Sequence, residues 1–63
     1  MQNPPRNTIQ IGARVAIVQK QDQRSGALSE GIVQAILTRS PTHPHGIKVR
    51  LQSGQVGRVK KVY

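Results

Sequence analysis

Basic side chains gather in the C-terminal part of the chain. Residues 43–61, HPHGIKVRLQSGQVGRVKK, carry five lysines and arginines and no acidic residue. Residues 1–30 hold four basic residues and both acids, a net charge of +2, whereas residues 31–63 hold six basic residues and no acid, a net charge of +6. Charge of this density attracts phosphate-bearing partners through a long-range field, so polyanion binding is the first chemistry to consider.

His43 and His45 form an H-x-H pair that could supply two imidazoles to a zinc or nickel ion. Two ligands do not complete a site of three or four, and the chain offers no cysteine and no carboxylate nearby. We therefore expect no metal and no cofactor. We interpret PTHPHG as a loop stiffened by Pro41 and Pro44, with Gly46 allowing a sharp entry into the next strand.

The sequence shows no combination of residues that is typical of an active site. Asp22 and Glu30 are the two carboxylates, Ser25 and Ser53 stand in turn-like contexts, and the glycines do not form a phosphate-binding loop. We therefore expect that the protein is not an enzyme. Glu30 is expected to form a salt bridge with a neighbouring Lys or Arg.

The length of 63 residues predicts a single domain with a small core. The absence of cysteine excludes a disulfide framework and is typical of a reducing compartment. The first residues contain no apolar signal region, and no window approaches the ~18 apolar residues of a membrane span. We therefore expect a cytoplasmic protein with no membrane partner.

Hydrophobic patterning predicts the strands that would position the basic residues. β-Branched residues follow Gly12, residues 47–51 alternate cleanly, and residues 55–62 return after a turn. Residues 1–8 contain two consecutive prolines and show no periodicity, so we expect a flexible N-terminal segment. Residues 9–63 then predict an all-β domain, a small SH3-like barrel of four to five antiparallel strands, with residues 9–11 as the optional fifth.

Residues 27–38, ALSEGIVQAILT, fit two different periods. Leu28, Ile32 and Ile36 lie at helical spacing, whereas residues 31–37 also alternate as in a strand. A helix would hold Gly31 in its interior at a cost of about 1 kcal/mol. In a strand, a glycine instead marks a bulge or a bend where a small barrel curls. We therefore predict a strand, with a helix as the alternative.

The turn after residue 51 decides which side chains share a face. A two-residue loop would pair Val49 with Arg58 and bury a charge. A three-residue loop over residues 52–54, with Gly54 in a left-handed conformation, places Lys48 opposite Arg58 and makes both faces consistent. We predict this second register. The expected basic face is Lys48, Arg50, Arg58 and Lys60, with Val56 as its apolar exception, and the expected buried residues are Val15, Ile17, Val33, Ile47, Val49 and Val59.

Four segments carry a resemblance to a known family: residues 22–26 (DQRSG), 31–33 (GIV), 43–51 (HPHGIKVRL) and 54–61 (GQVGRVKK). On these segments the chain resembles the YwbE-like family of small bacterial proteins, over about two thirds of its length. That family is a domain of unknown function, so the resemblance implies an identity and no mechanism. It also implies that the HPHGIKVRL and GQVGRVKK segments recur in the family.

A second, looser resemblance involves two glycines and the β-branched residues that follow them, Gly12, Val15, Ile17, Gly31, Val33 and Ile36. They resemble the KOW pattern of ribosomal proteins and transcription elongation factors. That unit is SH3-like and often contacts RNA. The resemblance therefore implies an RNA partner before a DNA partner.

The composition narrows the kind of binding to expect. Surfaces that stack single-stranded bases, grooves for proline-rich peptides and methyl-lysine cages use aromatic side chains, and Tyr63 is the one aromatic residue here. Like charges opposed across a strand pair are destabilising, and no nearby acid relieves them. Each lysine or arginine alone could serve to keep an edge strand soluble. Four on one face without an acid favour contact with phosphates.

We therefore expect a non-catalytic protein that binds nucleic acid, structured RNA before DNA, by phosphate contacts. The alternative is a protein-interaction module whose basic face docks an acidic protein or completes a larger assembly. The candidate nucleic-acid-binding residues are Lys48, Arg50, Arg58, Lys60 and Lys61, followed by Arg39, His43 and His45 on the long loop.

Overall fold

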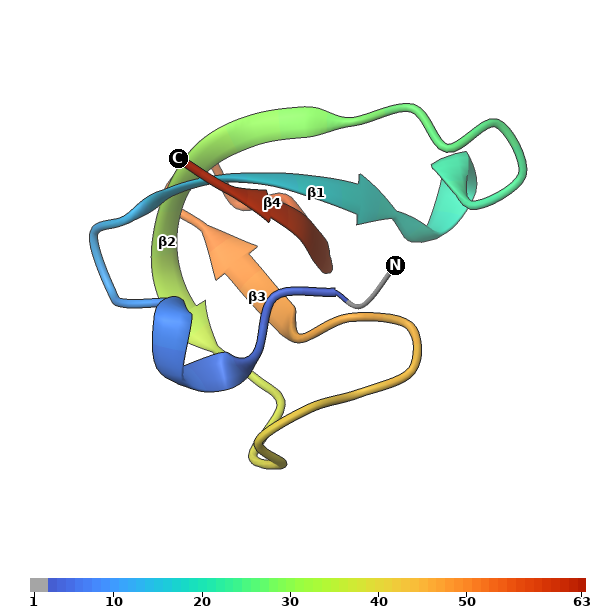
Figure 1. Ribbon diagram of the computed structural model, residues 1–63. Helices are drawn as coiled ribbons and strands as arrows, with labels where there is room; N and C mark the ends of the chain where they lie inside the picture. Colours follow the sequence, from blue (N-terminus) through green and yellow to red (C-terminus); the bar gives the residue numbers. More distant parts are fainter. Residues whose placement is uncertain (1–2) are drawn as a thin grey trace.

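The computed structural model describes residues 3–63 as a closed barrel of antiparallel strands (Figure 1). The strands, in chain order, are β1 (Arg14–Gln19), β2 (Ser29–Ile36), β3 (Lys48–Leu51) and β4 (Val56–Val62), and β4 pairs with β1 to close the barrel. Two short 3₁₀ helices, η1 (Arg6–Thr8) and η2 (Lys20–Asp22), lie outside the sheet. The fold class predicted from the sequence, a small SH3-like all-β barrel, is confirmed in its four-stranded form, since residues 9–11 do not form a strand.

The hairpin of β3 and β4 has the predicted register. Lys48 pairs with Arg58, and the backbone N–H of Val59 donates to the carbonyl of Ile47 at 2.8 Å. The loop spans residues 52–54, because the N–H of Leu51 donates to the carbonyl of Gln55, and Gly54 has a φ of 94°. The three-residue turn inferred from the charge pattern is therefore confirmed.

The core consists entirely of aliphatic side chains. All six residues predicted to be buried are fully buried, and Ile9 and Leu51 join them. The complete cluster is Ile9, Val15, Ile17, Val33, Ile47, Val49, Leu51 and Val59. A core this small can be enclosed because barrel closure leaves no unpaired sheet edge.

Residues 29–36 form strand β2, so the strand prediction is confirmed and the helical alternative is excluded. The register with β3 shifts between Val33 and Ala35, and this bulge lets both Val33 and Ile36 pack against the core. The bulge explains why the sequence mixes two periods. Gly31 has a different role, because a Cβ there would lie 2.7 Å from Cδ1 of the buried Leu51, which would have to shift.

A second bulge lies in β4. Ala16 pairs with Lys61, but Ile17 pairs with Val59, so Lys60 is the extra residue on that strand. Val59 is consequently buried and Val62 packs against the core, while both lysines between them are exposed. Without the bulge, strict alternation would turn one of the two lysines inward.

The N-terminal segment packs on the long connection between β2 and β3. The backbone N–H of Arg6 donates to the carbonyl of Pro41 at 2.8 Å, and the side-chain amide of Asn3 donates to the carbonyl of Pro44 at 3.0 Å. The flexibility expected of residues 1–8 stays a prediction, of which residues 1 and 2 lie outside the described residues. Within residues 3–63, no helix has the length and apolar character needed to cross a membrane.

Candidate nucleic-acid interface

The outer surface of β4 carries basic side chains between two projecting connections. Residues 20–28, which include η2, lie on one side, and the loop over residues 37–47 lies on the other (Figure 1). Val18 of β1 pairs with Arg58 of β4 and is 7% exposed, so it provides an apolar floor beside the guanidinium stem. The two strands are close here because Gly57 has no side chain: a Cβ would lie 2.5 Å from the carbonyl oxygen of Val18.

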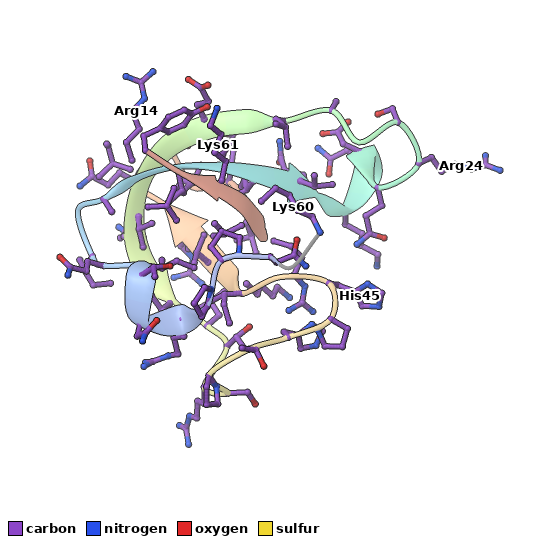
Figure 2. All side chains as sticks on the ribbon, viewed as in Figure 1. Arg14, Arg24, His45, Lys60 and Lys61 are labelled. Atoms are coloured by element: carbon purple, nitrogen blue, oxygen red, sulfur yellow. The ribbon has the colours of Figure 1, made fainter. Side chains whose placement is uncertain are left out.

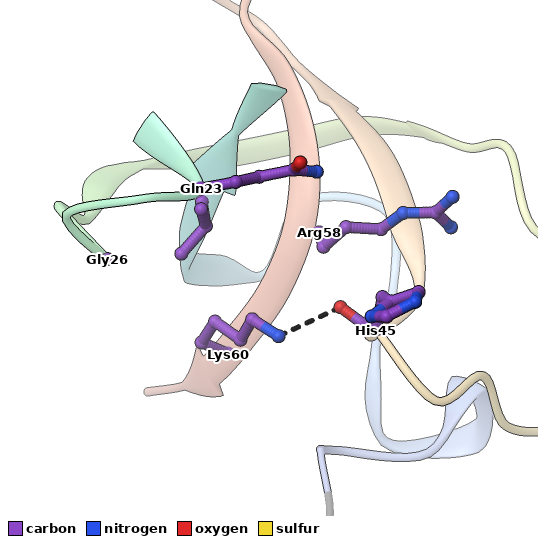
Figure 3. A pocket seen from close by; sticks show the side chains of 6 residues that line it. Gln23, Gly26, His45, Arg58 and Lys60 are labelled. Carbon is purple, nitrogen blue, oxygen red and sulfur yellow. Dashed lines mark hydrogen bonds between the residues drawn. The ribbon is translucent and has the colours of Figure 1, made fainter. Parts of the chain in front are cut away.

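Two adjoining hollows lie on this surface. The first, which we call the upper hollow, has a volume of about 400 Å³ and is lined by Val18, Gln23, Gly26, His45, Arg58 and Lys60 (Figure 3). The lower hollow, of about 480 Å³, is lined by Val18, Lys20, Gln21, Gln23, Lys48, Val56, Gly57 and Arg58. Three residues, Val18, Gln23 and Arg58, line both hollows and therefore lie between them. Among the described residues, no acidic side chain lines either one.

The guanidinium of Arg58 is held by neutral oxygens of the long loop. Its Nη1 donates to the hydroxyl of Thr38 at 3.4 Å and to the carbonyl of Gly46 at 3.3 Å. These two long contacts orient the side chain toward the loop without neutralising its charge. Arg58 therefore presents a positioned cation to both hollows.

Lys60 has the same kind of support. Its ammonium donates to the carbonyl of His45 at 2.9 Å, drawn in Figure 3, and to the side-chain oxygen of Asn3 at 3.4 Å. Both acceptors are neutral. Arg58 and Lys60 thus use part of their hydrogen-bonding capacity to hold the loop, and keep their charge for a ligand.

The two histidines lie together in the loop, with ring centroids 5.7 Å apart. Nδ1 of His43 accepts the backbone N–H of His45 at 3.1 Å, which closes a local turn. Partial burial of the ring, together with the charges of Arg58 and His45, lowers the pKa of His43 below its ordinary value of 6.5. The two rings have no further ligands, since no group of three or more His, Cys, Asp or Glu residues within residues 3–63 could hold a metal ion.

Four predicted site residues, Arg39, Arg50, Lys61 and His43, line neither of the two hollows. Arg50 is exposed on β3 opposite Val56, and Arg39 lines a separate hollow with Arg6. Lys61 lies 5.1 Å from the centre of the Tyr63 ring. The structure therefore groups Lys48, Arg58, Lys60 and His45 around the two hollows and places the other four outside them, with the His43 ring beside that of His45 in the loop.

Lys61 belongs to a cluster around Glu30 where β1, β2 and β4 meet (Figure 2). Arg14 forms an ion pair with Glu30 at 2.9 Å, as the sequence predicted for that carboxylate, and the hydroxyl of Tyr63 donates to it. The hydrogen bonds from Tyr63 and Arg14 lower the pKa of Glu30 below its ordinary value of 4.5. Arg14 therefore already has an acidic partner within the fold.

Two residues of the site could not be assigned from the sequence. Lys20 lines the lower hollow and Gln23 lines both, because η2 folds the chain back after β1. Arg24, one residue further along, instead projects away from the barrel (Figure 2). A polar run broken by glycine predicts a turn but does not say which of its side chains face the sheet.

The chain matches a family model described as "Uncharacterized conserved protein (DUF2196)" over residues 2–62. It belongs to this family. The chain is also 50% identical over 62 residues to the "Uncharacterized protein YwbE" of Bacillus subtilis (strain 168), which covers 98% of this chain and 95% of that protein. No solved structure matches it. The YwbE-like resemblance is thus confirmed, and the family description assigns no activity.

Proposed function

We propose that this protein is a non-catalytic, cytoplasmic nucleic-acid-binding protein that contacts the phosphates of RNA through the two adjoining hollows. One observation carries the proposal. Four basic side chains, Lys20, Lys48, Arg58 and Lys60, line the two hollows, and no acidic side chain of the described residues does. Such a concentration of one charge sign attracts polyanions and retains them by releasing their counterions.

The difference between these cations and Arg14 supports a role in binding. Arg14 faces Glu30, so its charge is compensated within the fold. Arg58 and Lys60 are held by carbonyl, hydroxyl and amide oxygens, which leave their charge uncompensated. Within residues 3–63, the ammonium groups of Lys20 and Lys48 have no hydrogen-bond or ion-pair partner. We therefore expect removal of either ammonium to leave the fold intact.

RNA is favoured over DNA because the chain resembles the KOW pattern, a unit that often contacts RNA. The residues that carry this resemblance are Gly12, Val15 and Ile17, followed in β2 by Gly31, Val33 and Ile36. The cytoplasm is favoured by the absence of cysteine. No nucleophile with an adjacent base, and no acid–base pair, lines the hollows, so their chemistry suits binding.

The test is a titration of fluorescently labelled structured RNA, followed by anisotropy at ~50 mM salt and repeated at increasing salt. If the four basic residues neutralise four phosphates, the log–log slope of affinity against salt should be about 3 to 3.5. Lys20→Glu and Lys48→Glu should each weaken binding and reduce the slope by about one.

The matched control is Arg24→Glu, which makes the same change of net charge on the same connection as Lys20 but outside the hollows. It should change affinity much less than Lys20→Glu does. Equal losses would mean that net charge and not this surface governs binding. A flat titration with the unmodified protein would refute the proposal. Binding of poly-glutamate in that case would favour docking of an acidic protein.

A further inference from the structure

The upper hollow contains more than phosphate binding requires. Besides Arg58 and Lys60 it offers an imidazole ring from His45, a carboxamide from Gln23 and an apolar floor from Val18 (Figure 3). We propose that this hollow binds one unpaired nucleotide, so that the preferred ligand is an RNA with an unstacked base in a bulge, loop or end. This inference rests on the proposed function and specifies its ligand.

The imidazole of His45 is suited to stacking against a base. Histidine is among the side chains on which unstacked RNA bases pack, and His45 is exposed at the hollow. Its main chain is fixed from both sides, because its N–H donates to Nδ1 of His43 and its carbonyl accepts from Lys60. The ring is therefore presented from a backbone that needs little further ordering on binding.

Gln23 adds a group that can recognise the edge of a base. Its side chain extends from the connection after β1 over β4 toward Arg58 (Figure 3), and it lines both hollows. A carboxamide carries both a donor and an acceptor, which match the mixed hydrogen-bonding edges of nucleobases. A surface that recognised only the charge of phosphates would gain little from an amide at this position.

The cations are arranged to bind the phosphates on either side of such a nucleotide. Arg58 uses Nη1 for the loop, so its Nη2 and Nε stay available, and the ammonium of Lys60 keeps one of its three protons. Lys20 and Lys48 follow in the lower hollow, beyond Arg58. A single strand crossing from one hollow to the other would meet basic groups throughout.

The size of the upper hollow agrees with this ligand. About 400 Å³ lies within the range of 300–1,000 Å³ that is typical of small-molecule sites. In a continuous duplex every base is paired and stacked, so filling the hollow would require a base to be flipped out. An RNA that already contains an unpaired nucleotide avoids that cost and should bind more tightly.

The experiment compares a blunt RNA duplex with the same duplex carrying one bulged nucleotide, by anisotropy at ~50 mM salt. The bulged RNA should bind about tenfold more tightly, in line with the contribution of stacking one base. His45→Ala should abolish the preference, whereas His45→Phe should restore it. The main-chain carbonyl that holds Lys60 is present in both variants, so the comparison isolates the ring.

Gln23→Ala should also reduce the preference, and Gln34→Ala, an exposed amide on β2 outside both hollows, should leave it unchanged. Equal, salt-dependent affinity for both RNAs would overturn this inference while the proposed function stands. A preference that persists in His45→Ala and Gln23→Ala would overturn the assignment to this hollow. Absence of binding to either RNA would refute both proposals.

Free AMP is the competitor that separates RNA from a soluble nucleotide. If the site is built for RNA, AMP should displace the bulged duplex only at concentrations far above that of the duplex, because its single phosphate can contact Arg58 or Lys60 but does not reach Lys20 and Lys48 of the lower hollow. Displacement by AMP at equal concentration would overturn the RNA assignment in favour of a free nucleotide.

Discussion

Gly46 provides the sharpest test of how the long loop is seated on β4. Its φ is 99°, in the region that side-chain-bearing residues avoid, and a Cβ added there would lie 2.7 Å from the backbone carbonyl oxygen of Val59. Gly46→Ala therefore combines backbone strain of about 1 kcal/mol with an overpacking cost of about 1 to 3 kcal/mol. A sum of about 2 to 4 kcal/mol is a large share of the roughly 3 to 9 kcal/mol expected for a domain of this length.

Two other glycines separate the two contributions. Gly54 has nearly the same φ, 94°, but nothing lies within 4 Å of its added Cβ, so Gly54→Ala reports strain alone. Gly57 has no positive φ, but its Cβ would lie 2.5 Å from the carbonyl oxygen of Val18, so Gly57→Ala reports contact alone. We expect the loss in Gly46→Ala to approach the sum of the other two losses.

Urea unfolding followed by far-UV circular dichroism measures all three variants, with thermal melting as a second readout. Gly54→Ala should lower the Tm by about 4 to 8 °C, and Gly46→Ala by at least twice as much. Equal Tm values for Gly46→Ala and Gly54→Ala would refute the reasoning. That result would mean that the loop moves away from Val59 at no cost, and that His45 and the carbonyl of Gly46 are not held in place.

Three further outcomes are expected. Because the pKa of His43 is lowered in the folded state, the unfolded state binds more protons as the pH falls below 6.5, so the Tm should fall on acidification from that pH. The Tm should fall a second time below pH 4.5, as Glu30 is protonated. In His43→Asn, which keeps an acceptor for the N–H of His45, the first of these two decreases in Tm should be absent. Arg58→Ala should lower both stability and RNA affinity, because the guanidinium also holds the loop, and a variant as stable as the parent would contradict this. Thermal unfolding should be identical with and without a chelator, and a large drop in Tm on adding one would show that the two histidines belong to a metal site.

The β3–β4 hairpin could be predicted from the sequence because three independent constraints agreed. Alternation placed Ile47 and Val49 on one face, the cost of burying a charge excluded the pairing of Val49 with Arg58, and Gly54 allowed the turn that remained. Each constraint is local and depends on neighbouring residues. The basic pair of Lys48 and Arg58 followed from the same register.

The rest of the site depends on structural features that the neighbouring sequence does not indicate. The bulge in β4 decides that Lys60 and Lys61 both face outward, and they then point to different surroundings, one to the long loop and the other to Tyr63. Alternation alone could not separate them. The neutral oxygens that hold Arg58 and Lys60 come from loop carbonyls, which every sequence has and which only the folded loop places.

The pairing of β1 with β4 has a consequence for how the chain reaches its fold. Val15 pairs with Val62, so the barrel closes by joining residues that are far apart in the sequence. Such non-local contacts form late and slowly, on a scale of about milliseconds to seconds in small β-barrels. β4 is the last of the four strands in chain order, and until it inserts, β1 and β3 each expose an unpaired edge that another chain could pair with. We therefore expect any aggregation that starts from these edges to occur before β4 inserts, and the net charge of +8 to oppose it by mutual repulsion.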